Sequence, residues 1–156
     1  MRPYKEFCAP DKRLAPYNAK TEAIATAHPV CQHLETGPGV GPLTTTALIA
    51  AVSDGSAFKN GRQFAPWLGL VPRRHSTGGK ARLLGISKRG DVYLRTPLVH
   101  GARATLRWVG RQPDRRSKWV RALMARRGKN KTAVALAPKN ARIAWVLLSS
   151  DQTYMG

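Results

Sequence analysis

Residues 36–52 read TGPGVGPLTTTALIAAV, and this stretch decides the fold that the sequence predicts. Its glycines end the helix-prone segment before them, because glycine weakens a helix interior and tolerates tight turns. Pro42 then fits the first turn of a new helix. After it, Leu43, Ala47 and Ala51 recur at helical spacing. The stretch therefore predicts two helices joined by a glycine turn.

This arrangement resembles the helix-hairpin-helix motif, in which a glycine turn and the next helix N-terminus present backbone N–H groups to a DNA phosphate. Gly39 and Gly41 are the candidate DNA-binding residues of the turn. The alternative is a tight turn between helices that contacts no ligand. Residues 1–57 hold five basic and five acidic side chains, so the local charge does not favour phosphate contact.

The segments before the glycine turn divide at prolines. Residues 1–17 contain Pro3, Pro10 and Pro16 and predict a flexible arm. Residues 18–56 form the helix-hairpin-helix region, in which Pro29 separates two short helices, expected at 19–27 and 30–34.

Residues 57–149 form a basic region, with helices expected at 57–68, 90–109, 114–127 and 132–148. Residues 69–88 predict an extended loop or small hairpin, and the tail 150–156 is expected to fray. Pro97 and Pro138 are expected to disturb their helices. The predicted fold class is therefore mainly α: a helix-hairpin-helix followed by a basic helical domain with a small extended loop or hairpin around a serine motif.

The segment 114–127 has the pattern of an amphipathic basic helix. Its inward face is expected to carry Trp119, Val120, Leu123 and Met124. Its outward face is expected to carry basic residues, namely Arg115, Lys118, Arg121 and Arg126.

The formal net charge is +19, and it belongs entirely to the second part of the chain. Residues 58–156 hold 22 basic and three acidic side chains. Such an excess implies a polyanionic partner, most often a nucleic acid. Two cysteines and no signal peptide favour the reducing cytoplasm. No apolar run is long enough to span a bilayer, so no membrane partner is expected.

Residues 72–95, PRRHSTGGKARLLGISKRGDVYLR, hold the first candidate for a nucleophile, Ser76. The alternative is that this serine only binds a phosphate or caps a turn. The neighbouring cations suit binding of a phosphodiester and stabilisation of its transition state. They supply the candidate DNA-binding residues Arg73, Arg74, Lys80, Arg82, Lys88, Arg89 and Arg95.

The sequence predicts neither a nucleotide site nor a metal site. A P-loop would need serine or threonine where Ala81 stands. The group His28, Cys31 and His33 lacks a clear fourth zinc ligand. The aspartates that could hold Mg²⁺ are scattered along the chain, at positions 54, 91, 114 and 151. No cofactor is therefore expected in this chain alone.

Several ordered motifs together closely resemble the C-terminal transposase domain of the IS110 (IS116/IS110/IS902) family, which is related to the Piv-type DNA invertases. The resemblance extends from about Tyr17 to Leu148. It rests on TGPGVGPLT at 36–44, FKNGRQFA at 58–65, WLGLVP at 67–72, HSTGGK at 75–80, GISKRG at 85–90 and YLR at 93–95.

The resemblance implies a DNA recombinase that moves insertion sequences in the bacterial nucleoid. It implies that Ser76 is the serine that joins covalently to DNA, with Thr77 in the neighbouring, more permissive place. It also implies a composite site with a RuvC-like domain, whose DEDD carboxylates hold Mg²⁺, and an assembly guided by a structured RNA.

The chain is too short to include a RuvC-like domain. We therefore expect a truncated transposase that binds DNA and depends on a RuvC-like domain or full-length transposase in trans for recombination. Whether the chain alone is an enzyme is left open by the sequence. The alternative is a non-catalytic helix-hairpin-helix protein that binds nucleic acid, or a remnant.

Overall fold

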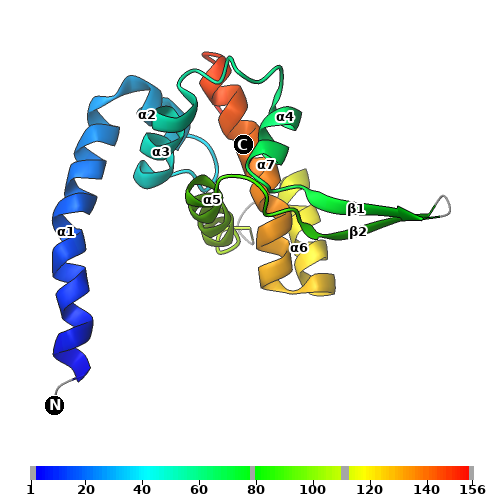
Figure 1. The fold of residues 1–156 in the computed structure, drawn as a ribbon, viewed down its shortest axis with the longest axis horizontal. Helices are drawn as coiled ribbons and strands as arrows, with labels where there is room; N and C mark the ends of the chain where they lie inside the picture. The colour runs from blue at the N-terminus through cyan, green and yellow to red at the C-terminus, as the bar shows by residue number, and fades with distance from the viewer. Residues whose placement is uncertain (1–2, 78–79, 110–112, 155–156) are drawn as a thin grey trace.

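The computed structural model describes residues 3–77, 80–109 and 113–154, with the backbone alone for residues 3–11, 76–77 and 80–83. These residues form seven helices and one two-stranded sheet, which confirms the mainly α fold class (Figure 1). In chain order the elements are α1 (Pro3–Ala27), α2 (Pro29–Glu35), α3 (Pro42–Val52), α4 (Gly61–Trp67), β1 (Pro72–Thr77), β2 (Lys80–Ile86), α5 (Val92–Thr105), α6 (Arg115–Arg127) and α7 (Lys129–Ser149).

The N-terminal segment, expected to be a loose arm, is helical from Pro3 onward and extends away from the rest of the molecule (Figure 1). Residues that favour helices, namely alanine, lysine, glutamate, arginine and leucine, make up about half of α1. The predicted break at Pro29 is confirmed. α1 ends at Ala27, His28 is extended, and Pro29 occupies the first position of α2.

The glycine turn between α2 and α3 packs against α5. Gly39 has a φ of +70°, which favours glycine. A Cβ on Gly101 of α5 would overlap the carbonyl oxygen of Gly39. Glycine is therefore required on both sides of this contact. Gly41 is the N-cap of α3, and Pro42 follows as its first residue, as predicted.

α7 is the central helix, since α2, α4, α5 and α6 all pack against it. Its buried alanines and leucines meet apolar side chains such as Phe64 and Leu98. α5 and α7 both continue through their prolines, Pro97 and Pro138, although a proline in a helix interior removes one hydrogen bond. The extensive contact between these two helices offsets that loss. Among the described residues, no helix has the length and hydropathy needed to cross a bilayer.

The predicted extended loop or hairpin is a hairpin. β1 and β2 are antiparallel, with Arg74 opposite Leu83 and Thr77 opposite Lys80. The pairing is irregular between Pro72 and Arg74. The hairpin projects from the body on the side away from α1 (Figure 1).

Candidate nucleic-acid interface

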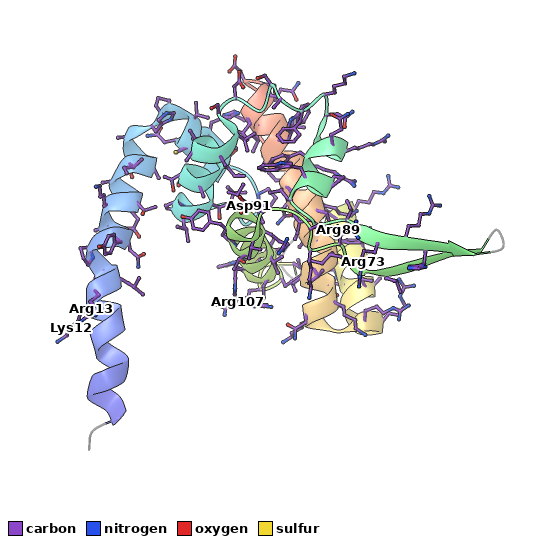
Figure 2. The ribbon with its side chains drawn as sticks, viewed as in Figure 1. Lys12, Arg13, Arg73, Arg89, Asp91 and Arg107 are labelled. Carbon is purple, nitrogen blue, oxygen red and sulfur yellow. The ribbon has the colours of Figure 1, made fainter. Side chains whose placement is uncertain are left out.

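The hairpin brings two groups of predicted DNA-binding residues to its base. Arg73 and Arg74 are exposed on β1, and Lys88 and Arg89 are exposed just after β2. Strand pairing continues to this point, because the Ser87 N–H donates to the Val71 carbonyl oxygen at 2.8 Å. Figure 2 shows Arg73 and Arg89 at the junction between the hairpin and the body.

The serine motif occupies the far end of the same hairpin. Ser76 lies opposite Ala81, and Thr77 lies opposite Lys80. The same register places Arg82 opposite His75 on the neighbouring strand. The side chains of Ser76, Thr77, Lys80 and Arg82, together with Gly78 and Gly79, lie outside the part of the chain that the structure describes. The roles predicted for these residues therefore stay predictions.

Two backbone segments cross at the base of the hairpin. A Cβ on Gly90 would overlap the carbonyl oxygen of Trp67, so glycine is required at this crossing. The Lys88 N–H donates to the Gly69 carbonyl oxygen at 3.1 Å. Lys88 has a φ of +58°, which is uncommon for a residue other than glycine. The backbone at Lys88 therefore adopts the left-handed conformation, while the side chains of Lys88 and Arg89 are exposed to solvent.

Arg95 holds the crossing together from α5. Its side chain is half-buried, and Nη1 donates to the Gly90 carbonyl oxygen at 3.1 Å and to the Leu68 carbonyl oxygen at 3.5 Å. The structure therefore places this predicted DNA-binding residue beneath the exposed cations, in contact with the backbone that positions them.

Three described aspartates, Asp54, Asp91 and Asp114, do not fit a Mg²⁺ site, because their carboxylates form local hydrogen bonds at a turn or a helix start. Asp91 Oδ1 accepts from the Leu94 N–H at 3.1 Å, and Asp114 Oδ2 accepts from the Arg116 N–H at 3.0 Å. The Ser56 N–H donates to Asp54, and this hydrogen bond lowers the pKa of the Asp54 carboxyl. Within the described ranges, no three histidine, cysteine or acidic residues gather as a metal site would require.

The glycine turn borders a shallow apolar groove of about 520 Å³ between α3 and α5. Gly39, Gly41 and His100 are among its lining residues. A Cβ on Gly41 would meet nothing within 4 Å, and α3 begins without a side-chain cap. An incoming group can therefore approach the start of α3, whereas Gly39 is engaged by α5.

A second set of exposed cations lies on α6, outside the predicted site residues. Of the predicted inward face, Val120 is buried and Trp119, Leu123 and Met124 are half-buried. The four predicted outward basic residues are exposed. The amphipathic pattern itself was the sequence feature that could have marked this face as a site. Lys12 and Arg13, by contrast, lie on α1, far from Arg73 and Arg89 (Figure 2).

Comparison with known proteins gives a consistent set of relatives. A family model described as "Transposase IS116/IS110/IS902 family" matches residues 31–124. The chain is similar to the transposase for insertion sequence element IS1111A of Coxiella burnetii, with 48% identity over 151 residues, covering 97% of this chain and 42% of that protein.

Two further relatives are similar to the chain at lower identity. The transposase for insertion sequence element IS1328 of Yersinia enterocolitica is 43% identical over 123 residues, covering 79% of this chain and 37% of that protein. The pilin gene-inverting protein of Moraxella bovis is 35% identical over 107 residues, covering 67% and 31%. The chain spans less than half the length of each of these relatives.

Proposed function

Because the chain belongs to the IS116/IS110/IS902 family of transposases, we propose that it is a DNA-binding C-terminal region of a recombinase that transposes or inverts DNA. The observation that carries this proposal is the placement of the charge. The family match at residues 31–124 includes most of the basic side chains of residues 58–156, and cations of that basic region are exposed at the base of the hairpin and on α6.

The proposed phosphate contacts begin at the base of the hairpin, where Arg73, Arg74, Lys88 and Arg89 are exposed. Lys80, Arg82 and Thr77 would extend these contacts along the hairpin, since the strand register places all three on its outer half. The proposed role of Arg95 is to position this surface by holding the backbone at the crossing.

The glycine turn supplies a further proposed contact, of the helix-hairpin-helix type. The backbone at Gly41 and the uncapped start of α3 are open to an approaching phosphate, and a helix N-terminus favours an anion. Gly39 would act by shaping the turn, because α5 occupies the space beside it.

The proposed chemistry is transesterification at Ser76. A bond forms between Ser76 Oγ and the phosphorus of a DNA phosphodiester, and the bond from that phosphorus to one deoxyribose oxygen breaks. The serine proton ends on the departing oxygen, which becomes a free hydroxyl. The number of phosphodiester bonds is conserved, so the step needs no nucleotide cofactor. Nearby cations would stabilise the charge that develops on the phosphoryl oxygens.

Mg²⁺ chemistry would require carboxylates other than those of Asp54, Asp91 and Asp114, which form local hydrogen bonds at a turn and at helix starts. We propose that a RuvC-like domain provides them and that a structured RNA takes part in the assembly, as the family resemblance implies. The local hydrogen bonds of these three aspartates also favour a second candidate function, a non-catalytic protein that binds nucleic acid.

Covalent trapping on nicked duplex DNA separates the two candidates. The chain is incubated with end-labelled DNA, in the presence of a RuvC-like domain from a relative, and denaturing gels report any protein–DNA adduct. We expect an adduct with the wild-type chain and none with Ser76→Ala, whose DNA affinity should remain nearly unchanged because a hydroxyl carries no charge.

Thr77→Ala is the matched control and should retain the adduct, since it removes the neighbouring hydroxyl from the same hairpin. An adduct that persists in Ser76→Ala would show that another group is the nucleophile. Binding without any adduct in the wild-type chain would support the non-catalytic function.

A further inference from the structure

One face of α6 is left open by the fold. The opposite face packs against α7, with Ser117 and Val120 buried. The Lys139 ammonium of α7 lies 4.0 Å from the centroid of the Trp119 ring of α6, which adds a cation–π contact between the two helices. The open side, which we name the outer face of α6, consists of six exposed residues: Arg115, Lys118, Arg121, Ala122, Ala125 and Arg126.

The outer face is narrow, and its small residues lie between its cations. At 100° per residue, the six positions fall within an arc of about 140°. In order around the helix, Ala125 lies between Arg121 and Lys118, and Ala122 lies between Lys118 and Arg115. The face extends about 17 Å along the axis at the helical rise of 1.5 Å per residue. The helix surface between the long basic side chains is therefore open to close approach.

The charge of this face is not balanced locally. Asp114 is the single acidic residue between positions 113 and 131, and it is engaged as the cap of α6. Arg115 and Lys118 are three residues apart, as are Lys118 and Arg121, so like charges are neighbours on the helix surface. Beyond the helix, Lys129 and Lys131 add two more exposed cations. Because cations lie on both sides of the two alanines, this face is suited to contact negative charges along both of its edges.

We propose that α6 inserts its outer face into the major groove of duplex DNA. The alanines would lie against the base edges, and the flanking arginines and lysines would contact the two phosphate backbones. The inference rests on the proposed function of DNA binding and adds a contact separate from the base of the hairpin. The hairpin and α6 lie on the same side of the molecule, away from α1 (Figure 1).

The shape of the face favours DNA over duplex RNA. The major groove of B-form DNA is about 12 Å wide and admits an α-helix, whereas the major groove of A-form RNA is too narrow for one. An alanine methyl can contact a thymine methyl group at the floor of the DNA groove. Phosphate contacts from the flanking cations would fix the helix in register.

Disulfide cross-linking tests the position of the helix directly. Ala122→Cys in the full chain is mixed with a mixed-sequence duplex that carries a thiol tether on cytosine N4, in the major groove. We expect cross-linking several-fold above that of the matched control Ala51→Cys, an exposed alanine at the end of α3. A tether on guanine N2, in the minor groove, should give only the background set by the native cysteines. Equal cross-linking at the two positions, or a preference for the minor-groove tether, would overturn the proposal.

A salt titration of DNA affinity tests the flanking cations. Arg121→Ala should weaken binding about five- to tenfold near 0.1 M salt and make the log–log salt slope shallower by about one. Arg13→Ala, an exposed cation on α1, removes the same charge and should leave both values unchanged. If the wild-type chain binds duplex DNA and Arg121→Ala has the same affinity and salt slope as Arg13→Ala, the inference about α6 is wrong, while the proposed function of DNA binding stands. If the wild-type chain shows no salt-sensitive binding, the proposed function fails as well.

Discussion

Gly39 and Gly101 show how single residues decide the arrangement around the glycine turn. They are 62 positions apart in sequence, and their backbones meet where the turn crosses α5. Any side chain at Gly101 would occupy the position of the Gly39 carbonyl oxygen. Gly39 itself has a positive φ that other residues adopt only with strain. The contact therefore fixes where the start of α3 lies on α5.

We expect Gly101→Ala to lower the free energy of unfolding by about 1–3 kcal/mol, since the backbone must shift to accept one carbon. This net loss already includes the gain of about 1 kcal/mol that replacing glycine by alanine usually brings to a helix interior. Urea denaturation followed by circular dichroism measures the change. Gly85→Ala is the control, because a Cβ there meets nothing within 4 Å. Equal effects of the two substitutions would contradict the steric argument.

At the scale of the element, α6 depends on its N-cap. Asp114 accepts hydrogen bonds from the Arg116 and Ser117 backbone N–H groups, and it places a negative charge at the positive end of the helix. Hydrogen bonds from Ser117, through its side chain first and then its backbone, lower the pKa of Asp114 below the ordinary 3.8. The charged form of this carboxyl is therefore the form that stabilises the fold.

Because the pKa of Asp114 is lower in the folded chain, its stabilising effect is present above pH 3.8. The effect is lost as the pH falls through the folded value. We expect Asp114→Asn to keep the cap and to weaken the loss of stability between about pH 5 and pH 2. Asp114→Ala should lower the thermal midpoint at neutral pH. Melting curves across this range provide the measurement, and an unchanged pH dependence in Asp114→Asn would contradict the assignment.

At the scale of the whole molecule, the C-terminal tail connects α6 with the core. The Tyr154 hydroxyl accepts from Arg116 Nη1 at 2.8 Å, and the Asn140 side-chain carbonyl accepts from Nη2 of the same arginine. The Tyr154 ring packs against the apolar core. The expected fraying of the tail therefore does not extend to Tyr154, because Tyr154 contacts α6.

We expect Tyr154→Phe to lower the free energy of unfolding by about 1 kcal/mol, since Arg116 loses one acceptor while the ring packing remains. Equilibrium denaturation in urea measures this difference. Tyr93→Phe makes the same chemical change at a side chain that is 66% exposed, and it should be neutral. A neutral Tyr154→Phe would indicate that water replaces the hydroxyl without cost.

Local sequence patterns predicted much of the fold and part of the candidate site. The break at Pro29, the start of α3 at Pro42 and the two faces of α6 were all predicted, because each depends on residues within one or two helical turns. The hairpin was predicted only as one of two possibilities. Other prolines were misleading, since α1, α5 and α7 continue through prolines in their interiors.

The sequence by itself determined the fold class, the partition of the charge and the family, since these depend on composition, local periodicity and ordered motifs. Only the tertiary structure decided that Arg95 lies beneath the cations at the base of the hairpin and that the Gly39 turn rests on Gly101. It also decided that Arg116 joins the tail to α6. These features depend on contacts between distant segments. Local periodicity does not encode them, because the close approach of two backbones is set by how the helices pack around α7.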